Sequence, residues 1–224
     1  SGMALGFANC KNMSFYNINS RNCGFDGIHF ENKCENVYVY NLYINECSRG
    51  INIGSCKNIN IINAVVDNCT IWLAMSNLHS NNEEIKLQNV VFDSNKVINS
   101  SVASQMKGFE INDMKDSVFR DIFINNSGAT GYGFLNLGLS KYLKADNTNS
   151  NGYIDIQGCT FENVRIKAGT HTIANSRKLM ILGDNSKGNT FKNIKLEGYN
   201  AEDLMDFSSN KKYKFENYLV DYEF

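Results

Sequence analysis

Short runs in which apolar and polar residues alternate recur along the whole chain. In residues 27–46 they read GIHFE, NVYVY and LYINE, and asparagine, glycine or serine residues separate such runs elsewhere. Alternation with a period of two turns one face of a β-strand inward, so each run predicts a short strand. The runs recur in units of 22 to 30 residues, with one longer unit. The pattern therefore predicts an all-β chain made of repeats of three short strands.

A second regularity places one asparagine in each repeat. It follows an apolar residue by two positions and precedes another apolar residue. The position is occupied by Asn17, Asn41, Asn63, Asn89, Asp121, Asn163, Asn193 and Asn217. Cysteines also recur, because Cys10 and Cys23, Cys34 and Cys47, and Cys56 and Cys69 are each 13 residues apart. Repeats of this length indicate a stacked, solenoid-like architecture.

Three strands that close every twenty-odd residues predict one coil of a right-handed parallel β-helix, with about eight coils in the chain. Asparagines at the bend between the second and third strands are expected to bond to their equivalents in a ladder. The absence of proline fits, because a buried parallel ladder needs every backbone N–H. A leucine-rich repeat shares the period and the asparagine, but it requires leucine where this chain has mainly Ile, Val and Phe.

This pattern resembles the right-handed parallel β-helix of the pectin-lyase-like superfamily over residues 4–224. It is most similar to the asparagine-rich, proline-poor forms in phage tailspikes and appendages and in bacterial polysaccharide-degrading enzymes. The resemblance implies that a glycan lies along the face made by the first strands, between walls of loops. The chain is interpreted as a single domain, 1–224. It begins inside a coil, so a longer parent chain with an N-terminal cap is expected.

Composition excludes several function classes. A net charge of −1 and a pI near 6.3 argue against nucleic-acid or anionic-membrane partners. No apolar stretch reaches the roughly 18 residues of a membrane span. The seven cysteines form no CxxC or zinc-like spacing, so we expect no metal and no cofactor, and the stacked thiols are expected to be reduced. Free thiols suggest assembly in a reducing cytosol before action outside the cell.

Candidate chemistry comes from the outward positions of the first strands. These positions read Gly6, His29, Asn52, one near Trp72, Glu110, Asp155, one near Met180, and Asp206. Glu110 and Asp155 are predicted on consecutive coils about 5 Å apart, where two carboxylates can divide acid and base or nucleophile roles. This pairing requires YIDI at 153–156 to be the first strand of its repeat. If GFLNL at 133–137 takes that place, the pair dissolves.

Other residues are candidates for binding substrate. They are His29, Asn52, Trp72, Tyr132 and Asp206, with residues 126–152 as a loop insertion that forms a groove wall. His29 has Asp26 and Glu31 nearby and shares an outward face with Glu31, so the two could form an acid–base couple. The segment CGFDGIHFE is similar to the Asp-Gly and Asp-Pro-His signatures of β-helix glycosidases and epimerases.

The sequence predicts a carbohydrate-active β-helix, a phage tailspike or appendage depolymerase that hydrolyses a bacterial surface polysaccharide. Two alternatives stay open. One is a non-catalytic glycan-binding adhesin or structural stalk. The other is a lyase or epimerase acting on uronate polymers, which is favoured only if His29 lies in the groove. A homotrimer is also left open.

Overall fold

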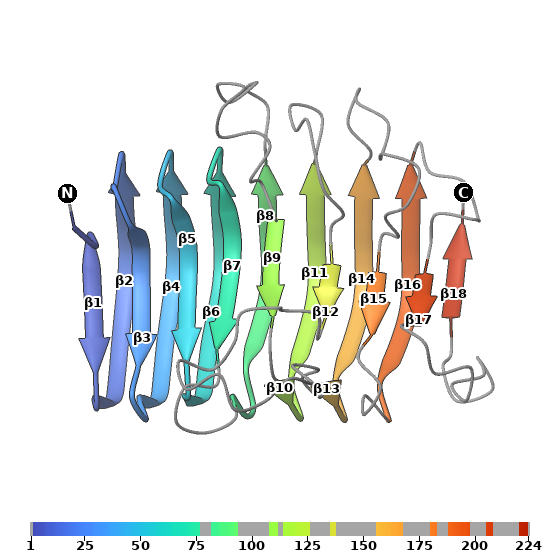
Figure 1. Cartoon of the computed structure of the whole chain (residues 1–224), viewed down its shortest axis with the longest axis horizontal. Helices are drawn as coiled ribbons and strands as arrows, with labels where there is room; N and C mark the ends of the chain where they lie inside the picture. The colour runs from blue at the N-terminus through green and yellow to red at the C-terminus, as the bar shows by residue number, and fades with distance from the viewer. Residues whose placement is uncertain are drawn as a thin grey trace, which may run out of the picture.

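The computed structural model describes residues 2–76, 82–93, 108–111, 114–125, 135–137, 156–167, 180–182, 188–197, 205–207 and 220–223. Every strand pair in these ranges is parallel, and strands alternate between two sheets along the chain. Figure 1 shows the sheets as two layers along the long axis, with their strands running in opposite directions. The prediction of an all-β chain with parallel strands is confirmed, and the arrangement is consistent with a β-solenoid.

The first sheet contains short strands. In spatial order they are β1 (Leu5–Ala8), β3 (Asp26–Glu31), β5 (Arg49–Gly54), β7 (Ile71–Ser76), β9 (Gly108–Ile111), β12 (Leu135–Leu137), β15 (Met180–Leu182) and β17 (Met205–Phe207). Residues 135–137 were expected in a loop, but they form β12 between β9 and β15.

The second sheet contains longer strands, each of which, apart from the four-residue strand Val220–Glu223, covers two of the runs predicted from the sequence. In spatial order they are β2 (Lys11–Arg21), β4 (Glu35–Asn45), β6 (Lys57–Asp67), β8 (Lys86–Asp93), β11 (Val118–Asn125), β14 (Thr160–Lys167), β16 (Thr190–Glu197) and β18 (Val220–Glu223). A short pair, β10 (Met114–Lys115) and β13 (Ile156–Gln157), precedes β11 and β14.

The core lies between the sheets and follows the alternation of the sequence. In the first sheet, Ile28 and Phe30 are fully buried and align with Ile51 and Ile53. In the second sheet the buried positions align as stacks of like residues, and the rings of Phe161 and Phe191 lie parallel at 4.9 Å. Burial of each such side chain stabilises the fold by about 1.5–3 kcal/mol.

Corners in the chain occur at residues with positive φ. The predicted asparagine position is one of them, and we call its described members the central row: Asn17, Asn41, Asn63, Asn89, Asp121, Asn163 and Asn193, with φ between 52° and 60°. Asparagine and aspartate tolerate this conformation better than other non-glycine residues. Within the row the Asn41 amide donates to Asn17 Oδ1 at 3.0 Å, and the Asn193 amide donates to Asn163 at 2.9 Å. Asn217 lies outside the described residues.

A second set of corners was not predicted. It lies five residues before the central row in each repeat, and we call it the leading row: Asn12, Asn36, Asn58, Glu84, Asp116, Gly158 and Gly188, all with positive φ. Asn36 donates to Asn12 at 3.0 Å, and Asn58 donates to Asn36 at 2.8 Å. Three asparagines thus serve leading-row corners that the sequence pattern did not single out.

Candidate functional site

A cluster of charged and polar side chains lies on β3 and β5 of the first sheet. His29 sits between the inward-facing Ile28 and Phe30, and it pairs in register with Asn52 on β5. Asp26 at the start of β3 pairs with Arg49 at the start of β5. The predicted outward position of His29 beside Gly6 and Asn52 agrees with the register of the sheet.

Asp26 is the centre of the cluster and is fully buried. Its Oδ1 accepts a bond from Arg49 Nε at 2.5 Å, and its Oδ2 accepts one from Asn52 Nδ2 at 3.0 Å. His29 Nδ1 lies 3.0 Å from the same Oδ2. Burial alone would raise the pKa of this carboxyl, but the bonds from His29 and Asn52 and the charge of Arg49 bring it below its ordinary value. Asp26 is therefore an ionised, immobilised anion.

The imidazole of His29 stands between two carboxylates. Its Nδ1 faces Asp26, and its Nε2 lies 3.5 Å from Glu31 Oε2. An ionised carboxylate can only accept, so a proton on either ring nitrogen would face an acceptor, and Nδ1 also lies 3.3 Å from Met3 Sδ. The acid–base couple predicted for His29 and Glu31 is geometrically possible, and Asp26 contacts the other side of the ring.

Exposed hydrophobic residues border the cluster. Met3 Sδ lies 3.3 Å from His29 Nδ1, and Met3 is 47% exposed. Phe25 is 52% exposed, and the Arg49 guanidinium lies 5.4 Å from the centroid of its ring. Met3 covers much of the imidazole, which leaves His29 only 8% exposed. The cluster is thus a charged centre with an apolar rim.

The predicted pair of Glu110 and Asp155 does not occupy consecutive positions of the first sheet. The register aligns Glu110 with Ala74 on one side and with Asn136 of β12 on the other. Asp155 lies outside the described residues, and the following residue, Ile156, belongs to β13, which pairs with β10. Of the two candidate strands in this repeat, GFLNL at 133–137 supplies the partner of β9, so the premise of the carboxylate pair is wrong.

Trp72 is not a surface platform. It is 2% exposed and packs against Phe92 and Phe109, with ring centroids 6.0 and 5.7 Å away. Its indole Nε1 donates to the carbonyl oxygen of Asp93 at 3.3 Å. The register aligns Trp72 with Gly50, an inward position, so the ring fills core volume there.

The remaining predicted binding residues have mixed outcomes. Asn52 is 5% exposed, and its amide donates to Asp26, so it holds the Asp26 carboxylate in place. The backbone of Asp206 aligns with Ile181 in the same column of the first sheet. Tyr132 lies outside the described residues. Arg49 was missed, although its offset of 23 residues from Asp26 equals that between His29 and Asn52 and was readable from the sequence.

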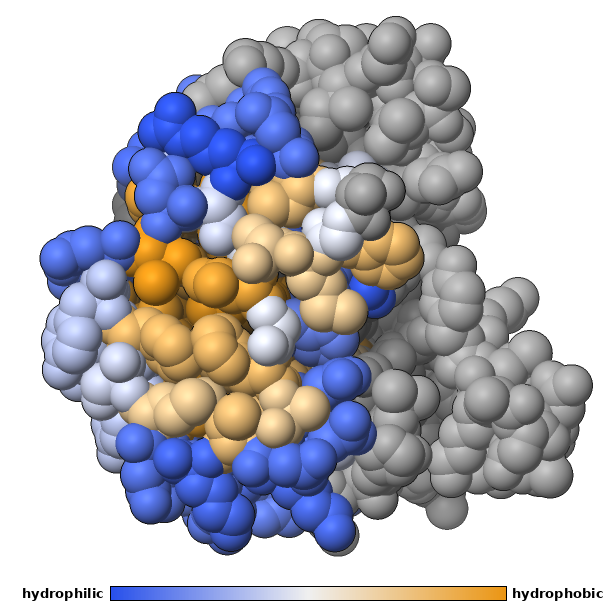
Figure 2. Space-filling view, turned by 90° about the vertical axis from the view of Figure 1, so that its left-hand side faces the viewer, coloured by the Kyte–Doolittle hydropathy of each residue, from blue (hydrophilic) through white to orange (hydrophobic). Residues whose placement is uncertain are grey.

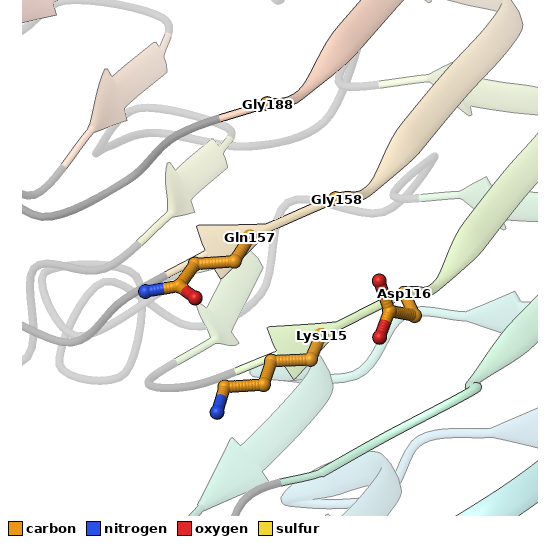
Figure 3. A pocket seen from close by; sticks show the side chains of 5 residues that line it. All are labelled: Lys115, Asp116, Gln157, Gly158 and Gly188. Carbon is orange, nitrogen blue, oxygen red and sulfur yellow. The ribbon is translucent and has the colours of Figure 1, made fainter.

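A separate pocket of about 420 Å³ lies at the leading row, away from this cluster. It is lined by Lys115, Asp116, Gln157, Gly158 and Gly188. Figure 3 shows the Lys115 and Gln157 side chains projecting in the same direction, while the two glycines contribute no side chain. The hollow forms where glycine replaces the asparagine side chains of earlier repeats.

Comparisons with known proteins supply no relative, because no family model, curated protein or solved structure matches the chain. Within the described ranges, no group of three or more His, Cys, Asp or Glu residues is arranged to hold a metal ion. No helix among the described residues is long and apolar enough to cross a membrane.

Proposed function

We propose that this protein is a right-handed, pectin-lyase-like β-helix that acts on a uronate-containing bacterial surface polysaccharide as a lyase or epimerase. The observation that carries the proposal is the His29 imidazole held between Asp26 and Glu31, with Arg49 beside it. Two-carboxylate hydrolysis has less support at this site, because Asp26 is fully buried and paired with Arg49.

The proposed chemistry uses the His29 tautomer that carries its proton on Nδ1 and leaves Nε2 free. His29 Nε2 removes the proton at C5 of a uronate unit, and Asp26 stabilises the resulting imidazolium through Nδ1. Arg49 uses Nε and one Nη for Asp26, so its other N–H groups can meet the uronate carboxylate, where negative charge develops. In elimination, the imidazolium returns the proton to the departing glycosidic oxygen at C4. In epimerisation, a water molecule delivers a proton to the opposite face of C5, and the imidazolium then returns its own proton to the resulting hydroxide.

A second candidate, a non-catalytic glycan-binding or structural β-helix, is favoured by a different observation. Met3 covers His29, and every oxygen of Asp26 already has a partner within the protein. A buried, fully bonded network of this kind also serves to hold adjacent strands in register. The two candidates differ in whether His29 exchanges protons with a substrate.

The test is incubation of the purified protein with uronate polymers and bacterial capsular polysaccharides in D2O. A lyase or epimerase gives unsaturated uronate or deuterium at C5, and His29→Gln should lower the rate at least about 100-fold. Glu31→Gln should shift the pH profile, whereas Glu35→Gln, the same change at an exposed ion pair with Lys11, should leave the rate unchanged.

Two results would overturn the proposal. New reducing ends without unsaturation, lost in Glu110→Gln, would restore the hydrolase predicted from the sequence. Retained binding on a glycan array with no deuterium incorporation and no product from any polymer would establish the non-catalytic alternative.

A further inference from the structure

Three cysteines lie in one column, at equivalent corners of successive repeats. Cys23, Cys47 and Cys69 each follow a long strand of the second sheet by two residues, and we call them the Cys47 column. Backbone bonds keep these corners aligned, because the Ser48 N–H donates to the Cys23 carbonyl oxygen at 3.2 Å and the Thr70 N–H donates to that of Cys47 at 3.3 Å. The three thiols therefore follow one another along the long axis.

The Cys47 column belongs to the core. Cys47 is 3% exposed, Cys69 is fully buried and Cys23 is half-buried. Figure 2 looks along the stack from the end where β1 lies and shows the core residues as an apolar area bordered by hydrophilic ones. Only a small oxidant can reach Cys47 in the folded chain, and the nearest reaction partners of its thiol are the other two cysteines.

The middle thiol is in hydrogen-bond contact with both neighbours. The bond from Cys69, together with that from Cys23, holds the pKa of Cys47 below its ordinary value, although burial and the charge of Asp26 act in the opposite direction. Burial and the contact with Cys47 raise the pKa of Cys23 to about 11. The column thus places a thiolate nucleophile against thiols that retain their protons.

The spacing of the column suits a disulfide bond. Neighbouring parallel strands lie about 4.8 Å apart, and the Cα atoms of disulfide-bonded cysteines are separated by about 4.4–6.8 Å. The Cβ atoms must approach to about 3.8 Å, which is a shift of about 1 Å. This shift falls on corner segments, since Cys23 lies between β2 and β3 and Cys47 lies between β4 and β5.

We infer that Cys47 is an oxidation site and that hydrogen peroxide joins it to Cys23 in a disulfide between successive repeats. The Cys47 thiolate attacks one peroxide oxygen, the O–O bond breaks, and Cys47 becomes a sulfenic acid. The Cys23 sulfur then attacks the Cys47 sulfur, and the hydroxyl group leaves as water with the Cys23 proton. Two thiols lose two electrons in total, and one peroxide molecule is reduced to two molecules of water.

Cys23 is the partner because it is the less confined neighbour of Cys47. Cys69 is fully buried, and its Sγ packs against Gly50, 3.6 Å from where a Cβ on that glycine would lie. Cys23 is half-buried and can turn toward Cys47 without displacing packed core atoms.

The disulfide would lie next to the charged cluster of the first sheet. Cys23 precedes Asp26 by three residues, and Cys47 precedes Arg49 by two. Asp26 and Arg49 are the first residues of β3 and β5, and they pair in register. The bond therefore links the two corners from which the chain enters the cluster.

A second cysteine column provides an internal comparison. In this Cys10 column, made of Cys10, Cys34 and Cys56, the backbone bonds from Glu35 to Cys10 and from Lys57 to Cys34 give the same alignment. There burial raises the pKa of Cys56 to about 12. Comparison of the two columns separates the effect of spacing, which they share, from the effect of the contacts around Cys47.

Peroxide treatment of the reduced protein at neutral pH, followed by peptide mapping, tests the inference. Trypsin places Cys23 on residues 22–33 and Cys47 on residues 34–49, so the disulfide appears as a link between two peptides. Fragmentation of the linked peptides distinguishes Cys47 from Cys34. We expect this link to form at least about tenfold faster than any bond within the Cys10 column, and dithiothreitol should reverse it.

Two serine variants identify the attacking thiol. Cys23→Ser should abolish the link and leave a sulfenic acid on Cys47, which dimedone labels. Cys10→Ser makes the same change at a half-buried cysteine of the other column, and it should leave the rate of the link unchanged. Melting temperatures establish that both variants are folded, and the comparison of the two columns in the wild-type protein needs neither variant.

Three outcomes would overturn the inference. The first is a Cys47 thiol that stays reduced at peroxide concentrations that oxidise Cys10. The second is formation of bonds at equal rates in the two columns, because spacing alone would then govern oxidation. The third is a link from Cys47 to Cys69, or to a second molecule in dilute solution, in place of the link to Cys23.

Discussion

Single corner residues explain the unusual composition of the chain. Asparagine occupies most of the non-glycine positions with positive φ in the described ranges, and the central row is only one of the sets. An asparagine at such a corner tolerates the left-handed backbone and also has both a donor and an acceptor for its neighbours. Aspartate also tolerates the left-handed backbone, but an ionised aspartate has acceptors and no donor.

Asp121 is the place where the central row is defective. It accepts from Asn163 at 2.8 Å, but an ionised carboxylate has no proton to donate toward Asn89 in the preceding repeat. Asp121→Asn restores a donor at an unchanged backbone conformation. We expect a gain in the free energy of unfolding of about 0.5–1 kcal/mol, limited by the loss of the charged acceptor for Asn163. Urea denaturation at neutral pH measures it.

Asp121→Ala is the control for this substitution. It removes the acceptor and forces a β-carbon without a local polar group into positive φ, so it should destabilise the fold by about 1–2 kcal/mol. If the asparagine variant were as unstable as the alanine variant, the bond to Asn89 would have no part in stability.

At the scale of strands, long strands were aligned correctly from the sequence, whereas short strands were not. Each long strand of the second sheet carries a full apolar–asparagine–apolar signature, and the predicted alignment of the central row agrees with the register. In the first sheet β12 is only three residues long, and β13 of the separate short pair is two residues long. Alternation in so short a run does not decide which of two candidates enters a sheet, and this is why the partner of Glu110 was predicted incorrectly.

The candidate site around His29 shows the same limit of prediction from alternation. Alternation brought His29 and Glu31 to one face, but the role of Asp26 depends on a bend that alternation does not encode. Gly27 points inward, because a Cβ there would lie 2.5 Å from Ile44 Cγ2, and Asp26 beside it reaches the side of His29. The bend also turns Trp72, which the register aligns with Gly50, into the core, where it cannot serve as a binding platform.

The bend in β5 predicts a specific intolerance at Gly50. A Cβ there would overlap Val66 Cγ1 and lie 2.7 Å from the carbonyl oxygen of Trp72, both of them in the packed core. Gly50→Ala should therefore lower the free energy of unfolding by about 1–3 kcal/mol. Gly6→Ala is the control, since its Cβ meets only the end of the Met3 side chain, at 3.0 Å. Equal midpoints for the two variants in urea would contradict the inward position of Gly50.

At the scale of the whole molecule, the cysteines near the N-terminal end are less buried than those farther along the long axis. All seven are free thiols; Cys10 and Cys23 near the N-terminal end are half-buried, and the buried ones are Cys34, Cys47, Cys56, Cys69 and Cys159. Burial raises the pKa of Cys56 to about 12 and that of Cys23 to about 11, so these two thiols hold little reactive thiolate at neutral pH. The hydrogen bond from Cys69 instead lowers the pKa of Cys47 to about 6, although the Cys47 side chain is buried.

This gradient makes alkylation a test of the fold. In dilute native protein, iodoacetamide should label Cys10 first and Cys23 more slowly, and it should label the five buried thiols only as fast as the chain unfolds. Mass spectrometry of the digested protein identifies each site. Rapid labelling of Cys34 or Cys56 in the native state would contradict the core described here.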